Sequence, residues 1–302
     1  MTTADAATPA PPAAGRGRRV ARWLHARPRL QPRLLLLVPL AWMLLVYLGS
    51  LLVLLVNAFW AHDAFTGKVT PFDWTLNAVH EIFSNSVYGT VALRTVGIAI
   101  AVTLTDTLLA FPIAYYMARV ASPRKRGVLI VAVLLPLWAA YLVKTYAWRT
   151  ILQGNGFLAW VLHPLGIAGP GLDKLPNAWL VLSYLWLPYM ILPIYAGLER
   201  IPGSLLEASS DLGAKAGTTF RRVVLPLVIP SLVAGSIFTF SLSLGDYIVP
   251  NLVANAKFIG NVIYDNSALG NFPVAAAYSM LPIVVMVGYL LIARRLGAFE
   301  SL

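Results

Sequence analysis

Residues 34–56 contain no charged side chain in 23 consecutive positions. As an α-helix rising 1.5 Å per residue, this stretch would be about 34 Å long, enough to cross the hydrocarbon layer of a bilayer, which is about 30 Å thick. The whole chain has the same character, because 59% of its 302 residues are hydrophobic and only 12% are charged. Soluble domains rarely have such a composition. We therefore predict an all-α membrane protein.

Five further apolar segments follow the first, at about residues 91–118, 127–148, 176–198, 223–244 and 272–293. Several of them contain proline, which membrane helices tolerate where neighbouring groups satisfy the carbonyls that it frees. We predict one membrane domain of six transmembrane helices over residues 34–302. The preceding residues 1–33 are rich in Ala, Pro and Arg with few large apolar side chains, so we expect a disordered basic tail.

Lysine and arginine set the orientation, because they accumulate in cytoplasmic loops. With six spans, the N-terminal tail, the second and fourth loops and the C-terminal residues share one side of the membrane. Seventeen of the 23 basic residues lie on that side: Arg16, Arg18, Arg19, Arg22, Arg27, Arg29, Arg33, Arg119, Arg124, Lys125, Arg126, Arg200, Lys215, Arg221, Arg222, Arg294 and Arg295. We predict that both termini are cytoplasmic, together with the fourth loop at about residues 199–222.

Two other interpretations of the basic residues are less well supported. A basic start before an apolar run is also typical of a secretory or twin-arginine signal, but this run is longer than the core of a signal and no convincing small-x-small cleavage site follows it. An uncleaved anchor is favoured. The net charge of +11 does not indicate nucleic-acid binding, because the basic residues lie between apolar segments rather than on a soluble domain.

The sequence lacks the patterns of an enzyme. It has no cysteine, and its four histidines include no pair at the spacing of metal ligands on a helix. The segment "GAKAGTT" lacks the Gly-Lys-Ser/Thr order of a phosphate-binding loop, and no serine lies in a G-x-S-x-G turn. We expect no catalytic residue, metal or cofactor in this chain, and an intramembrane enzyme is disfavoured.

Five side chains in or beside the spans are candidates for a solute pathway. Asp106 lies in the middle of the second span, where it would either line a hydrophilic path or hydrogen-bond to Thr103, Thr105 or a neighbouring helix. Asp246 follows the fifth span, where it would either meet a cationic solute or cap a helix end. The other three are aromatic residues of the fourth span, whose rings can face an ammonium group or simply pack: Tyr184, Trp186 and Tyr189.

The fourth loop contains "EASSDLGAKAGTTFRRVVLP", residues 207–226. Ser204 followed three residues later by Glu207 has the pattern of a capping box, which predicts a short helix ending at about Leu212. Gly213 would permit a turn into a second short helix. The apolar side chains of the first helix have no cover within the loop, and a helix this short is marginally stable alone, so we expect a partner surface.

At these residues the sequence resembles the permease subunits of ABC importers, the binding-protein-dependent transport family. The hallmark of that family is E-A-A, three residues, G, nine residues and I-x-L-P. Here Glu207, Ala208 and Ser209 precede Gly213, and after nine residues come Val223, Leu225 and Pro226, with Ser and Val as small departures.

The resemblance implies the type I importer (MetI-like) fold, with half of a translocation pathway in this chain. It also implies that the fourth loop forms coupling helices that dock into a cytoplasmic ATPase dimer, to which ATP and magnesium would bind. The residues carried over as coupling residues are Glu207, Ala208, Gly213, Leu225 and Pro226. An extracytoplasmic solute-binding protein and a second permease complete the implied assembly in the bilayer.

A second resemblance covers the chain from about Thr75 onward. "LPLWAAYLVKTYAWRTILQGNGFL", "GDYIVPNLV" and "FIGNVIYDN" are similar to the first permease of spermidine and putrescine importers. This implies a polyamine substrate and a second permease that is a different chain. Permeases for iron(III), aminoethylphosphonate and opine-like solutes share much of these segments and remain alternatives. A standalone channel or secondary transporter is disfavoured, because neither repeated halves nor a run of intramembrane ionisable residues is evident.

Overall fold

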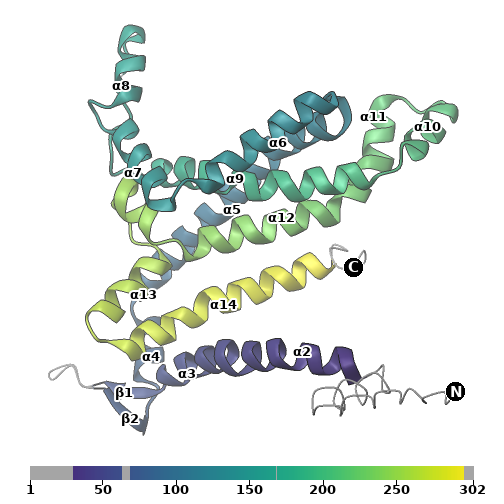
Figure 1. Ribbon diagram of the computed structural model, residues 1–302. Coiled ribbons are helices and arrows are strands. Elements are labelled where there is room, and N and C mark those ends of the chain that lie inside the picture. Colours follow the sequence, from purple (N-terminus) through teal and green to yellow (C-terminus); the bar gives the residue numbers. More distant parts are fainter. Residues whose placement is uncertain (1–29, 63–68, 168, 296–302) are drawn as a thin grey trace, which may run out of the picture. The chain divides into compact units, whose positions relative to one another are not determined.

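The computed structural model describes residues 30–62, 69–167 and 169–295 and is built almost entirely from helices (Figure 1). Residues 1–29 of the expected tail lie outside the described residues. The chain divides into two compact units, residues 1–54 and 55–302.

The first unit contains one long apolar helix, made of α2 (Leu30–Trp42), the π-helical turns η1 (Met43–Leu48) and the start of α3 (Gly49–Asn57). Its segment Leu35–Asn57 is long and apolar enough to cross a membrane, as predicted for the first span. None of its side chains in the η1 and α3 segments is buried, which suits a helix whose surroundings are lipid.

Three long helices form the centre of the second unit and pack against one another (Figure 1). They are α5 (Ser86–Tyr115), α9 (Leu175–Arg200) and α12 (Leu225–Gly245). Glycines allow α9 and α12 to approach closely. A Cβ at Gly197 would lie 2.1 Å from the Ser231 hydroxyl, and one at Gly235 would lie 2.8 Å from the Met190 sulfur. Small residues at helix contacts are the usual means of packing helices in membranes, where lipid tails are as apolar as the side chains.

The last span is α14 (Phe272–Arg295), which packs mainly against α13 (Ile259–Ala268) and the short helix α4 (Asn77–Ser84). Tyr278 of α14 is fully buried, and its hydroxyl donates a 2.8 Å hydrogen bond to the carbonyl of Tyr88 at the start of α5. A polar group buried in this way needs such a partner. This hydrogen bond joins the N-terminal part of α14 to the beginning of the second span.

The third predicted span, residues 127–148, is not one straight helix. The structure has α6 (Pro123–Trp138) and α7 (Tyr141–Leu152), joined through extended backbone at Ala139 and Ala140 and bent by 92°. Pro136 has no amide hydrogen and frees a carbonyl one turn earlier, which weakens the helix shortly before the break. With 16 residues, α6 is about 24 Å long. Within the described ranges, five helices are long and apolar enough to span a membrane, or six when the bent pair counts as one span.

The segments that connect the spans contain small elements. An antiparallel hairpin of β1 (Trp60–His62) and β2 (Val69–Trp74) precedes α4. After α7 come α8 (Phe157–Leu162) and the 3₁₀ turn η3 (His163–Leu165). The π-helical turns η5 (Pro250–Ala254) follow α12 and pack against α7 and α9. The hairpin and α8 both lie at the end of the second unit away from α10 and α11, well apart from each other (Figure 1).

Candidate functional site

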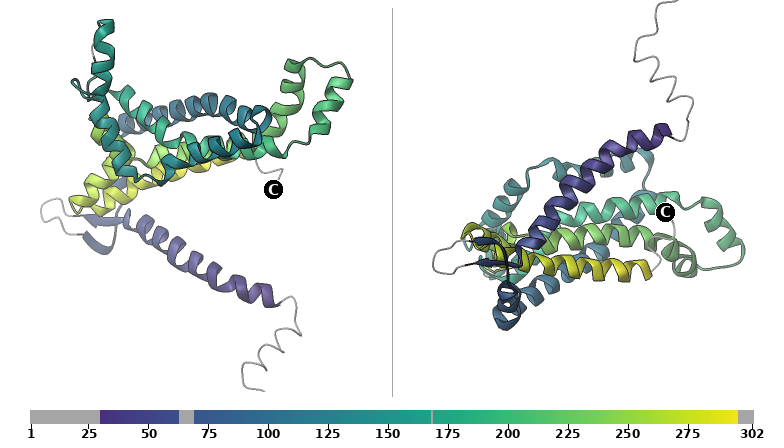
Figure 2. Two further views of the ribbon diagram at one scale, coloured as in Figure 1. Left: turned by 45° about the horizontal axis from the view of Figure 1, so that its top comes forward. Right: turned by 90° about the horizontal axis from the view of Figure 1, so that it is seen from below.

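The fourth loop forms a helical hairpin of α10 (Gly203–Asp211) and α11 (Ala216–Thr219). It projects beyond the ends of α9 and α12 in every view (Figures 1 and 2). The predicted capping box of Ser204 and Glu207 is wrong, because α10 begins one residue earlier, after Pro202, and has no side-chain cap. Pro202, with its φ of −62°, already sets the direction in which the chain enters the helix.

Gly213 makes the turn of the hairpin. Its φ is +77°, a left-handed conformation that side chains with a Cβ adopt at a cost, and its amide donates a 2.8 Å hydrogen bond to Ser210. The hydroxyls of Ser209 and Thr219 lie 2.8 Å apart and join α10 to α11. The glycine predicted as a coupling residue is thus the position on which the shape of the hairpin depends.

The five predicted coupling residues fall into two groups. Glu207, Ala208 and Gly213 are exposed on the hairpin, whereas Leu225 and Pro226 lie in the first turn of α12, where Leu225 is half-buried. The apolar side chains of the hairpin divide in the same way. Leu206 packs against the buried cluster at this end of the bundle, while Leu212 is 88% exposed. The exposed part of the hairpin therefore has room for a partner.

A cavity of about 350 Å³ lies near the other end of α12. Its lining residues are Tyr141, Trp186, Ser241, Leu242, Gly245, Asp246, Tyr247 and Ile248. The sequence-predicted residues Asp246 and Trp186 thus line one cavity although they come from different helices. None of the lining residues is a lysine or an arginine.

Asp246 is 8% exposed and fully hydrogen-bonded. One carboxylate oxygen accepts from the Tyr141 hydroxyl, and the other accepts from the amides of Ile248 and Val249 at 2.9 and 3.0 Å. Burial raises the pKa of Asp246, and these hydrogen bonds partly oppose that rise. The expected helix-end capping is thus present: the carboxylate holds the turn between α12 and η5 while it lines the cavity.

Aromatic rings stack around the indole of Trp186. The ring of Tyr141 lies 5.9 Å from it, centroid to centroid, and nearly parallel at 12°, while Tyr189 meets it edge-on at 5.9 Å. Tyr184 is not part of this cluster. It is 39% exposed and packs against Trp148 at 5.3 Å. The aromatic group predicted from one helix is therefore divided between two faces of α9.

Asp106 lies apart from the cavity, in the middle of α5 and close to Ser183 of α9. It is 0% exposed, and neither of its carboxylate oxygens has a hydrogen-bond partner among the described residues. The expected threonine partners bond elsewhere, since Thr103 donates to the carbonyl of Ala99 and Thr105 accepts from Trp179. A carboxyl buried in this way within a span is costly.

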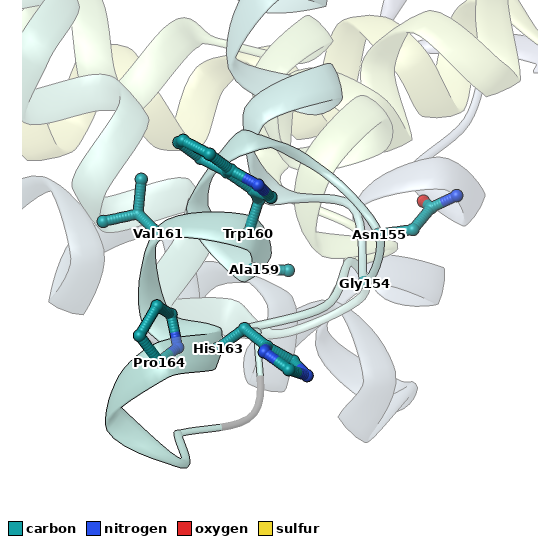
Figure 3. Close-up of a pocket in the computed structure, with 7 residues that line it drawn as sticks. All are labelled: Gly154, Asn155, Ala159, Trp160, Val161, His163 and Pro164. Carbon is teal, nitrogen blue, oxygen red and sulfur yellow. The ribbon is translucent and has the colours of Figure 1, made fainter.

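A larger cavity of about 660 Å³ lies against α8 and is lined by none of the sequence-predicted residues (Figure 3). Trp160 and His163 lie on its wall, with Gly154, Asn155, Ala159, Val161 and Pro164. Its lining carries no carboxylate. Across the described ranges, no group of three or more His, Asp or Glu side chains is placed to hold a metal ion.

Two kinds of residue were missed by reasoning from the sequence. Tyr141 belongs to a segment that resembles a permease family, but no local sequence pattern indicated that its hydroxyl would contact a site residue. Arg119 and Arg126 counted only as charges for orientation, although both make specific contacts at the end of α9. Their acceptors are mostly backbone carbonyls, which residue types do not reveal.

The family model described as "Binding-protein-dependent transport system inner membrane component" matches residues 32–299. The chain belongs to this family. It is therefore a multi-pass inner-membrane protein and the permease subunit of an ABC importer, not an enzyme. The resemblance stated from residues 207–226 is confirmed.

Two relatives of this permease illustrate its similarities. It is 48% identical over 285 residues to the inner membrane ABC transporter permease protein YdcU of Escherichia coli (strain K12), covering 89% of this chain and 90% of YdcU. It is 31% identical over 252 residues to the spermidine/putrescine transport system permease protein PotB of Haemophilus influenzae (strain ATCC 51907 / DSM 11121 / KW20 / Rd), covering 82% and 87%.

Solved structures confirm the fold of the permease. A chain of a bacterial ABC transporter that imports the acidic polysaccharide alginate matches with a TM-score of 0.65 at 17% identity, covering 92% of this chain and 99% of the other. The alginate transporter in complex with its pentasaccharide-bound periplasmic protein matches with a TM-score of 0.66 at 19% identity, covering 90% and 96%. At these identities the likeness concerns the fold alone.

Proposed function

We propose that this permease forms half of the translocation pathway for a small organic cation of the polyamine class. The observation that carries the proposal is the cavity in which the carboxylate of Asp246 and the stacked rings of Tyr141 and Trp186 lie together. The 31% identity to a spermidine/putrescine permease supports the same class of solute.

The chemistry of this cavity suits an ammonium group. A carboxylate supplies the opposite charge, and the faces of tryptophan and tyrosine rings attract cations through their quadrupoles. The cavity lining contains no lysine or arginine that would balance a phosphonate or a second carboxylate of an opine-like solute. Iron(III) favours a set of several oxygen ligands, whereas Asp246 is the one carboxylate on this wall. An organic cation is therefore favoured over these alternatives.

The Tyr141 hydroxyl already occupies one oxygen of Asp246. A bound ammonium group would share this carboxylate or displace the hydroxyl from it. Sharing leaves the two amide hydrogen bonds to Ile248 and Val249 in place, so the turn after α12 keeps its shape while solute passes.

Energy for the movement would come from a separate cytoplasmic ATPase dimer, which would bind ATP and magnesium. In this proposal Glu207, Ala208 and Gly213 contact the ATPase, and Leu225 and Pro226 set the start of α12 behind them. Nucleotide-driven closure would then shift the permease between inward-open and outward-open states. A second permease of different sequence and an extracytoplasmic solute-binding protein would complete the importer.

The proposal is tested in liposomes that contain the whole importer with its binding protein. Asp246→Asn keeps an acceptor for the amides but removes the charge, and Trp186→Phe keeps a ring but weakens the π-face. We expect both variants to raise the spermidine concentration needed for half-maximal uptake at least fivefold. Tyr184→Phe, on the other face of α9, is the matched control and should leave it unchanged. Equal uptake by all four proteins would contradict the proposal.

A further inference from the structure

Two arginines connect the second span to the base of the coupling hairpin. Arg119 lies in the π-helical turns η2 (Tyr116–Val120) that end the second span, and Arg126 lies in the first turns of α6. We name them, with the carbonyls that they bind, the arginine clamp.

Arg119 holds the end of α9. Its terminal Nη2 donates to the carbonyl of Leu198 at 2.5 Å and to that of Ile201 at 2.7 Å. The last carbonyls of a helix have no partner within the helix and carry its negative dipole end, so a guanidinium is well placed there. Ile201 is the residue at which α9 gives way to the connection into α10.

Arg126 contacts both η2 and α9 from α6. It donates to the carbonyls of Met117 and Ala118 in η2, at 3.1 and 3.0 Å, and pairs with Glu199 of α9 at 3.3 Å. The end of the second span is thus held against the end of α9 by both arginines. Met117, Ala118, Leu198 and Ile201 are all buried in one apolar cluster beneath these bonds.

The connection between α9 and α10 would otherwise be free to bend. Ile201 and Pro202 are extended, with ψ angles of 119° and 139°, so no helical hydrogen bonds cross from α9 into α10 at this point. Arg119 fixes the carbonyl of Ile201, two residues before α10 begins at Gly203. The connection is therefore tied to the second span through the Ile201 carbonyl.

The other end of the hairpin contacts the same span. Phe220, which follows α11, meets the ring of Phe111 of α5 edge-on, with centroids 5.5 Å apart. The hairpin is thus attached to the second span on both sides, by Arg119 where it begins and by Phe111 where it ends. The span so held is the one that carries the buried Asp106 in its middle.

We infer that the arginine clamp transmits movement of the coupling hairpin to the second span, with Arg119 as the positioning residue. This rests on the proposed docking of an ATPase at the hairpin. Both hydrogen bonds come from the single nitrogen Nη2, so a lysine ammonium can reproduce them in part, while the planar guanidinium fixes their direction.

The test uses the whole importer in liposomes and compares Arg119→Ala, Arg119→Lys and Arg124→Ala. Arg124 is a matched control, since it lies nearby in the first turn of α6, is exposed and makes no hydrogen bond or ion pair within the described residues. We expect Arg119→Ala to assemble normally and to keep its basal ATPase rate within about twofold, but to lose at least tenfold in solute moved per ATP hydrolysed. Arg119→Lys should recover part of this ratio, and Arg124→Ala should match the wild type.

A purely structural role would lower assembly, basal ATPase rate and uptake together, and that outcome would overturn the inference, as would normal coupling in Arg119→Ala. A second measurement is independent of the solute. The chain has no native cysteine, so spin labels can be placed at Lys215→Cys on the hairpin and Leu108→Cys on α5. Their separation should stay constant between nucleotide states in the wild type and change in Arg119→Ala. If the wild-type importer moves no polyamine, the proposed solute fails, and the clamp is still tested by the labels.

Discussion

The hydroxyl of Tyr141 donates to the carboxylate of Asp246 across 105 residues of sequence. Tyr141 is the first residue of α7, directly after the extended residues at which the third span bends by 92°. Without that bend the third span would continue along the direction of α6. The bend thus brings the Tyr141 hydroxyl to the Asp246 carboxylate, which lines the cavity.

Tyr141→Phe removes this hydrogen bond and keeps the ring that stacks on Trp186. Hydrogen bonds to charged groups contribute about 1.5–3 kcal/mol, so we expect a loss of that order in the free energy of unfolding. The melting temperature of the purified importer should fall accordingly. Tyr146→Phe, on the exposed side of the same helix, is the control. Equal melting temperatures for the two variants would show that the bond contributes nothing.

Gly213→Ala should weaken binding of the ATPase. The glycine has open space around its Cα, so the cost comes from the left-handed backbone alone, about 1–2 kcal/mol. Gly213→Asn should be milder, because asparagine visits this conformation more readily. Gly217→Ala in α11 also adds a methyl group into open space, at a residue without positive φ, and should bind the ATPase normally. Copurification of the ATPase with each variant decides between these outcomes.

Gly197→Ala should separate α9 from α12, because the added methyl group would lie 2.1 Å from the hydroxyl of Ser231. Overpacking of this kind costs about 1–3 kcal/mol. The double variant Gly197→Ala with Ser231→Gly should recover part of the lost stability, since it removes the clashing side chain. Gly288→Ala in α14 meets nothing within 4 Å and should melt at or above the wild-type temperature, since alanine favours helix. A double variant no more stable than Gly197→Ala would contradict the close contact.

Asp106→Leu should raise the stability of the permease while it lowers transport. Replacing a buried carboxyl that lacks partners by an apolar side chain of similar size removes a desolvation cost, so the melting temperature should rise. If the carboxyl is used when the second span moves, uptake should fall in the same variant. Normal uptake together with higher stability would assign Asp106 no part in transport.

The parts of the fold that follow from local composition were predictable. Apolar runs located five of the spans, and the glycine at position 213 marked its turn correctly. The break at Ala139 was not predictable, because alanine favours helix and Pro136 is one of several prolines that other spans accommodate. The position at which a proline-weakened helix breaks is decided by packing with segments distant in sequence.

The candidate site was predictable in its residue types but not in its grouping. Asp246 and Trp186 stood out as polar and aromatic residues near spans, whereas their meeting with Tyr141 depends on the bend of the third span. Tyr184 looked equivalent to Trp186 in sequence, yet helical rotation places the two on different faces of α9. The arginine clamp could not be predicted from the sequence for another reason: most of its acceptors are backbone carbonyls, which every residue has.

ATP-driven uptake by the reconstituted importer tests the central claim most directly. ATP and radiolabelled solute are placed on opposite sides of liposomes that contain this permease, its partner subunits and the binding protein. The account predicts accumulation of spermidine or putrescine that requires ATP and is not reduced by excess aminoethylphosphonate. Accumulation of the phosphonate or of iron(III) without any polyamine uptake would contradict it.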